Sequence, residues 1–141
     1  MNDTDDAIAR WLCCNWFSSV RELADFDLQR RTWLVPTNRN PHWSYIEFVN
    51  SYPDEEQLID AQVRGWLTAP EFDALNELKR TIEAYSAPGA EDYDNAAVLD
   101  DPTWRAVIQT AGRVQRQLLA IVTDSDERTA LRDSPSPSLS P

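Results

Sequence analysis

Carboxylates are the side chains of this 141-residue chain that carry the strongest chemical signal. Asp and Glu number 24 against 13 Lys and Arg, which gives a formal net charge of -11 at pH 7. Two stretches, residues 47–60 and residues 91–101, hold acid without any Lys or Arg. A negative surface repels nucleic acid and attracts basic partners. The charge therefore points to binding of a basic molecule rather than to a reaction.

Aromatic side chains lie in or beside both acidic stretches. Tyr45, Phe48 and Tyr52 accompany the first stretch, and Tyr93 and Trp104 accompany the second. Carboxylates around aromatic anchors suit an interface with a basic protein. The alternative interpretation is that acid-rich helical surfaces serve only solubility.

The predicted partner-binding residues are the carboxylates of these stretches. They form a first patch and a second candidate patch: Glu47, Asp54, Glu55, Glu56 and Asp60 in the first, and Glu91, Asp92 and Asp94 in the second. Trp43 and Trp66 lie near acidic segments and helix ends, so either could be a partly exposed anchor of the interface. The alternative for each is a position in the core.

Neither a metal site nor nucleophilic catalysis is predicted. His42 is the only histidine, and the adjacent Cys13 and Cys14 lack the spacing of zinc ligands. A dyad of one cysteine with His42 is chemically conceivable, but a free cysteine among large apolar residues usually behaves as a small buried hydrophobe. Carboxylates are too abundant for the sequence to select a catalytic pair. We expect no cofactor and no enzymatic activity.

The composition limits the class of protein and the cellular compartment that we expect. The length fits one domain, and a hydrophobic content of 42% excludes a disordered acidic tail. Adjacent cysteines do not suggest a disulfide framework and fit a reducing cytosol. The acidic start and the lack of a long apolar run predict neither a signal peptide nor a membrane-spanning helix. We expect a cytoplasmic protein that binds neither membrane nor nucleic acid.

The elements that position these residues are all predicted to be helices. Apolar residues recur at helical spacing, and three helix starts are marked by Pro41, Pro70 and Pro102. Thr68 and Glu71 have the spacing of a capping box. The N-terminal helix, from residue 4 or 5 to about 19, carries apolar residues on more than one face, so we expect it to be deeply buried.

The predicted fold is an all-α, single-domain bundle of five to seven helices. The helical domain is expected over residues 1–123, and a disordered Ser/Pro-rich tail over residues 124–141. A second helix is expected from about residue 20 to 33, with a weak boundary to the first. Pro36, Pro53 and the segment 87–89 are expected to end helices.

Three segments in the middle of the chain resemble small bacterial helical immunity proteins of contact-dependent inhibition and other polymorphic toxin systems. They are residues 40–47 (NPHWSYIE), 65–71 (GWLTAPE) and 98–104 (VLDDPTW). The resemblance implies a cytosolic protein that binds and neutralises one cognate toxin domain, often a basic nuclease. We expect the chain to be a monomer that forms a 1:1 complex. Such families diverge at the binding face, so the site residues above rest on charge alone.

Three functional hypotheses follow. The first is an immunity protein whose carboxylates occupy the positive active site of a toxin as phosphate mimics. The second is a small-ligand-binding or enzymatic helical protein with an aromatic pocket gated by carboxylates. The third is an acidic adaptor in a cytosolic complex.

Overall fold

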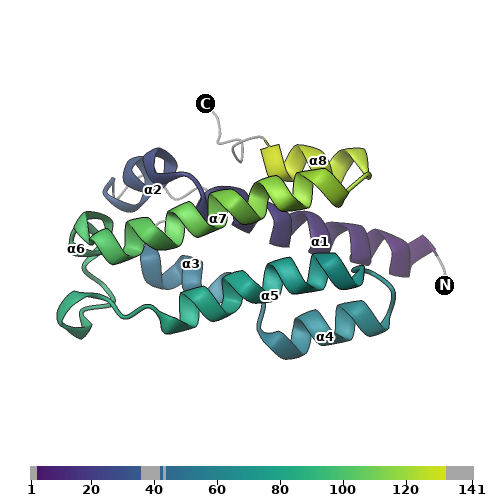
Figure 1. The fold of residues 1–141 in the computed structure, drawn as a ribbon, viewed down its shortest axis with the longest axis horizontal. Helices are drawn as coiled ribbons and strands as arrows, with labels where there is room; N and C mark the ends of the chain where they lie inside the picture. Colours follow the sequence, from purple (N-terminus) through teal and green to yellow (C-terminus); the bar gives the residue numbers. More distant parts are fainter. Residues whose placement is uncertain (1–2, 36–41, 43, 133–141) are drawn as a thin grey trace.

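The structure of the protein is a computed structural model that describes residues 3–35, 42 and 44–132 (Figure 1). These residues are largely helical and contain no strand, which confirms the all-α class for this part of the chain. Six helices have eight or more residues, and α3 and α6 are shorter. The helices are α1 (Asp3–Leu23), α2 (Phe26–Trp33), α3 (Tyr45–Ser51), α4 (Glu55–Val63), α5 (Ala69–Ala84), α6 (Asn95–Asp100), α7 (Pro102–Ile121) and α8 (Ser125–Arg132), with a short 3-10 turn η1 (Pro88–Ala90) before α6.

Three long helices form the frame of the bundle. α7 packs against α1 and α5, α4 folds back on α5, and α8 runs along α1 (Figure 1). The buried stripe of α7 has helical spacing, as the sequence predicts, and consists of Trp104, Val107, Ala111, Val114 and Leu118. None of the described helices is long and apolar enough to cross a bilayer.

A cluster of aromatic rings fills one half of the core. Trp104 is fully buried and packs edge-on against Tyr45, with ring centroids 5.2 Å apart. Trp33 and Tyr85 also contact the Trp104 ring, at 6.0 and 5.0 Å. The indole Nε1 of Trp104 donates to Oε1 of the buried Gln29 at 2.9 Å, so one polar contact joins α7 to α2 inside this apolar cluster.

Local sequence signals set several helix ends. The Thr68 hydroxyl accepts from the Glu71 amide, and Glu71 Oε1 accepts from the Thr68 amide, so the predicted capping box is present. Asp101 caps α7, and Pro102 occupies its first turn. Gly65 follows α4 with a φ of 81°, a left-handed conformation that costs glycine little. The predicted helix start at Asn40 and Pro41 lies outside the described residues.

Two boundary predictions are corrected. α1 continues to Leu23 rather than ending near residue 19, and Asp25 caps α2 by accepting from the Leu28 amide at 3.0 Å. The segment after residue 124 is not wholly a tail, because Ser125–Arg132 forms α8 with Leu131 fully buried. Arg21 Nε in α1 donates to the Arg132 carbonyl at 2.9 Å, and this contact helps to hold α8 against α1. Residues 133–141 lie outside the described part of the chain.

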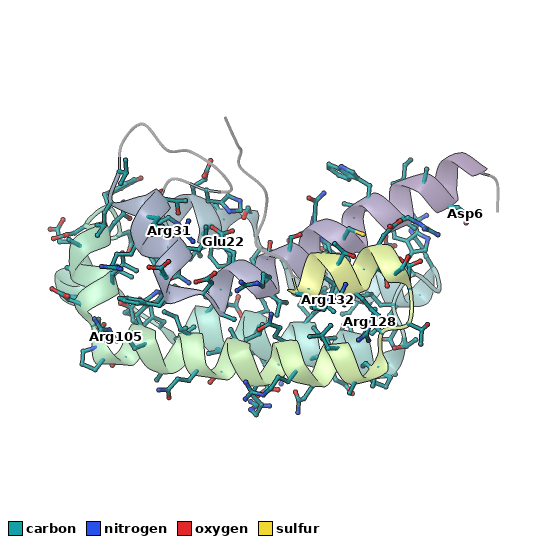
Figure 2. All side chains as sticks on the ribbon, turned by 90° about the horizontal axis from the view of Figure 1, so that it is seen from above. Asp6, Glu22, Arg31, Arg105, Arg128 and Arg132 are labelled. Atoms are coloured by element: carbon teal, nitrogen blue, oxygen red, sulfur yellow. The ribbon has the colours of Figure 1, made fainter. Side chains whose placement is uncertain are left out.

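The prediction that the N-terminal helix is deeply buried is wrong for its first half. Ile8 and Trp11 are exposed, Trp11 by 65%, whereas Phe17 and Val20 are fully buried. Figure 2 shows Asp6 on the end of α1 that projects furthest from the bundle. α8 runs beside α1 from Arg10, which pairs with Asp126, to Arg21, which donates to the Arg132 carbonyl, and the side that carries Trp11 stays open.

Candidate functional site

Four of the predicted acidic residues gather at the start of α4. Asp54 caps the helix by accepting from the Gln57 amide at 2.8 Å, so part of its acceptor capacity is used locally. Glu55, Glu56 and Asp60 are exposed on the following turns. An acid-rich first turn is stabilised by the positive end of the helix dipole. The acid of α4 therefore has a structural role as well as being available to a partner.

Basic side chains from outside the acidic stretch neutralise part of this charge. Arg64 Nε lies 2.8 Å from Asp60, one turn along α4. Arg80 of α5 lies 3.7 Å from Glu55, because α4 and α5 pack side by side. Exposed pairs of this kind stabilise the fold by only about 0–1 kcal/mol, so a partner can replace them at small cost.

Glu47 does not belong to the α4 patch. It lies partly buried on α3, and its negative charge helps to raise the pKa of Glu22 and of His42. The first predicted patch is therefore divided between two places in the fold.

The aromatic residues beside the first patch are not interface anchors. Tyr45, Phe48 and Tyr52 are buried, and the Tyr52 hydroxyl donates to the Leu75 carbonyl at 2.8 Å. α3 presents its aromatic face to the core, which corrects the expectation that this face accompanies surface acid. The apolar side chains that α4 does expose are Ile59 and Val63, the latter by 79%.

Of the two tryptophans named as possible anchors, the structure describes one, Trp66, and that one takes the alternative position against the core. Trp43 lies outside the described residues. Trp66 is partly buried, packs on the core, and has the Arg64 guanidinium 5.3 Å above its ring. Trp104, beside the second acidic stretch, is fully buried. Among the described tryptophans, the exposed one is Trp11, which lies on the helix predicted to carry apolar residues on more than one face.

The second predicted patch lies in the connection from α5 to α6. Glu91, Asp92 and Asp94 are exposed, and Asp94 caps α6 by accepting from the Ala97 amide at 3.1 Å. Tyr93 is 82% exposed between them. This connection thus keeps the predicted combination of acid and an aromatic side chain at the surface.

A groove runs between α4 and α5 and includes one of the predicted residues. Its volume is about 500 Å³, and the residues that matter here are Glu55, Phe72, Asp73, Asn76, Glu77 and Arg80. Asn76 is only 6% exposed, and its Nδ2 donates to Glu55 Oε2 at 3.4 Å. Its Oδ1 is buried and has no hydrogen-bond partner among the described residues.

A second groove, of about 490 Å³, follows the open side of α1. Trp11, Asn15, Ser18 and Glu22 line it from α1, and His42 and Gln57 line it from the opposite side. Glu22 is 1% exposed, near the C-terminal end of α1 (Figure 2), and its Oε1 lies 2.6 Å from Nδ1 of His42. A carboxylate that orients an imidazole at the edge of a groove is an arrangement found in many functional sites.

Burial and mutual charge shift both groups of this pair. Burial raises the pKa of Glu22, while the hydrogen bond and charge of His42 act in the opposite direction. Burial alone would lower the pKa of His42, but the hydrogen bond and charge of Glu22, with help from Glu47, raise it above its usual value. The pKa of each group therefore lies above that of the free side chain.

The cysteines do not form a dyad with His42 in the structure. Cys13 is buried and donates to the Trp66 carbonyl, and burial raises the pKa of its thiol to about 12. Burial also raises the pKa of Cys14. Among the described residues, no group of three or more His, Cys, Asp or Glu side chains is placed to hold a metal ion.

An acidic cluster at the start of α8 faces Arg10 of α1. Burial and the charges of Asp124, Glu71 and Asp126 raise the pKa of Glu127 to about 7, and only Arg10 opposes this. Arg10 pairs with Asp124 at 3.4 Å and with Asp126 at 3.2 Å. We therefore expect the docking of α8 to depend on pH near neutrality.

Sequence reasoning missed Trp11, Asn76 and the Glu22–His42 pair. Neither Asn76 nor Glu22 belongs to a sequence motif, and the residues around each are typical of a helix. Their importance comes from contacts with Glu55, 21 residues away, and with His42, 20 residues away.

Comparisons with known proteins identify no relative. No family model matches the chain, no curated protein matches it, and no solved structure matches it.

Proposed function

We propose that this chain is an inhibitory binding protein that holds a basic protein partner on the outer side of α4. The observation that carries the proposal is the composition of that side. Glu56, Asp60 and Val63 recur at helical spacing and are exposed, and Ile59 lies next to them. Carboxylates around exposed apolar side chains provide both parts of a protein interface.

The charge of the whole chain supports a basic partner. A net charge of -11 attracts positively charged proteins over a distance and speeds their encounter. The same charge disfavours nucleic acid, because phosphates would be repelled. The resemblance of residues 40–47, 65–71 and 98–104 to immunity proteins of polymorphic toxin systems supports a cognate toxin domain, such as a nuclease, as that partner.

Charge reversal separates the two acidic patches. The variant Glu56→Lys/Asp60→Lys changes the charge of α4, and Glu91→Lys/Asp92→Lys makes the same charge change in the α5–α6 connection while sparing the Asp94 cap. The partner to test is the C-terminal domain encoded by a neighbouring toxin gene, with affinity measured by calorimetry at low and high salt.

The α4 variant should lose at least about tenfold in affinity at low salt and should bind with a weaker salt dependence. The connection variant should bind like the wild type. Loss of binding in the connection variant alone would move the interface to Tyr93 and its neighbours. Unchanged affinity and salt dependence in both variants would refute an acidic interface.

The groove along α1 favours a second candidate function, the binding of a small ligand. The observation is a buried carboxylate paired with a partly exposed imidazole, together with the exposed Trp11, in a groove of about 490 Å³, which is within the size range of ligand pockets. A ligand bound there raises the melting temperature of the wild type by mass action. A thermal-shift screen in which every stabilising compound acts equally on Glu22→Gln would reject this site.

A further inference from the structure

The groove between α4 and α5 contains a hydrogen-bond acceptor that the described residues leave unsatisfied. Glu55 is a carboxylate that can only accept when ionised, so Asn76 must present its amide NH2 group to it. This orientation leaves Oδ1 as the other end of the amide, buried and without a partner. Buried polar atoms almost always have a partner, so an orphaned carbonyl oxygen on a residue that lines a groove indicates a donor supplied from outside.

The other walls of the groove are also rich in acceptors. Glu55, Asp73 and Glu77 contribute three carboxylates from two helices. Glu77 is engaged by Arg113 of α7, whereas Asp73 is exposed at the mouth of the groove. The ring of Phe72 is partly buried beside them and supplies an apolar surface. The entering group must therefore bring several donors and positive charge on an apolar stem.

Arg80 of the chain itself does not fill this role. Its guanidinium lies 3.7 Å from Glu55, and its side chain is 73% exposed at the rim. The pair of Arg80 with Glu55 leaves Asn76 Oδ1 without a hydrogen-bond donor. An incoming cation would share or replace the contact of Arg80 with Glu55.

We infer that the α4–α5 groove receives an arginine side chain of the partner, whose guanidinium pairs with Glu55 and Asp73 and donates to Asn76 Oδ1 once the Asn76 amide turns toward the groove. Arginine fits better than lysine, because its planar fork carries five donors that reach acceptors on two helices at once. Its stem and guanidinium plane can pack on Phe72. The inference rests on the proposed function, since it specifies how the basic partner is recognised.

A free probe tests the groove without the partner. N-acetyl-arginine methylamide is titrated into the full chain, and the side-chain amide signals of Asn76 are followed by NMR. The citrulline analogue has nearly the same shape as the arginine probe but no charge. The lysine analogue has the charge but lacks the planar guanidinium and its several N–H donors. The arginine probe should shift the Asn76 signals saturably, the citrulline probe should not, and the lysine probe should bind more weakly.

Two charge-matched variants then locate the effect. Asp73→Asn should weaken arginine-probe binding at least about threefold, whereas Asp100→Asn, which neutralises an exposed acid on α6, should leave it unchanged. The absence of a saturable shift, equal shifts from the citrulline or lysine probes, or equal effects of the two variants would overturn the arginine site.

The partner distinguishes this inference from the proposed function. Asp73→Asn and Asn76→Leu should lower affinity for the toxin domain, the second by about tenfold or more in a chain whose circular dichroism is unchanged. If both variants bind normally while Glu56→Lys/Asp60→Lys does not, the arginine site is wrong and the proposed function stands. If the probe binds the groove but the toxin domain does not bind the chain, the site stands and the proposed function is wrong.

Discussion

Replacing Trp104 by Phe tests whether a single buried polar contact ties three helices together. Trp104 Nε1 of α7 donates to Gln29 Oε1 of α2 at 2.9 Å, and both residues are fully buried. Gln29 Nε2 donates in turn to the carbonyls of Glu22 at 2.9 Å and Leu23 at 3.0 Å, in the last turn of α1. The glutamine thus holds the end of α1 and the indole of α7 at the same time.

The expected cost follows from what each substitution removes. Trp104→Phe keeps an aromatic ring but leaves Gln29 Oε1 buried without a donor, which should lower the free energy of unfolding by about 1–3 kcal/mol. Trp104→Ala also removes the ring between Tyr45 and Tyr85, so its cost should rise to about 3–5 kcal/mol. The order wild type, Phe, Ala in decreasing stability is therefore required.

Urea denaturation followed by far-UV circular dichroism measures these free energies. Fluorescence is less suitable, because the substitution removes a tryptophan. The matched control is Trp11→Phe, the same change at a side chain that is 65% exposed, which should shift stability by no more than about 0.5 kcal/mol. If Trp104→Phe is as stable as Trp11→Phe, with unchanged dependence on urea, the Trp104–Gln29 contact contributes nothing and the reasoning fails.

Three further predictions concern ionisation and capping. The pKa of Glu127 is raised from 4.5 for the free side chain to about 7 in the folded chain, so the stability of the fold should decrease as pH rises from about 4.5 to about 7. Glu127→Gln should therefore melt at a higher temperature than the wild type at pH 8, and its melting temperature should depend less on pH. The same dependence of melting temperature on pH in both proteins would contradict the raised pKa. His42 is the only histidine, so its NMR titration is unambiguous: Glu22→Gln should lower its pKa, because the charge that raises it is lost, and an unchanged pKa would show that Glu22 is not its partner. Thr68→Ala should cost about 1 kcal/mol by thermal melting, because it removes one bond of the capping box, whereas Thr103→Ala, which lies beyond the Asp101 cap, should cost less.

Some contacts of the acidic residues on α4 can be predicted from spacing along the sequence, and others cannot. Asp60 and the C-cap residue Arg64 are four residues apart along α4, so their ion pair follows from spacing. Arg80 could not be assigned to Glu55 in that way, because their contact requires α4 and α5 to pack side by side. The exposure of Trp11 likewise depends on how far α1 extends past the helices that cover it.

The amino-acid sequence by itself determined the all-α class, the capping box of Thr68 and Glu71, the start of α7 at Pro102 and the buried stripe that follows it. These features depend on hydrogen bonds and side-chain spacing within a few residues, and such interactions are the same wherever the helix later packs. Tertiary structure alone decided that the aromatic face of α3 turns inward, that residues 125–132 fold onto α1, and that Asn76 meets Glu55 and His42 meets Glu22. Burial and pairing of this kind depend on which surfaces distant in sequence come together, because the same polar side chain is solvated on an open helix and becomes an unsatisfied or ion-paired group once a second helix covers it.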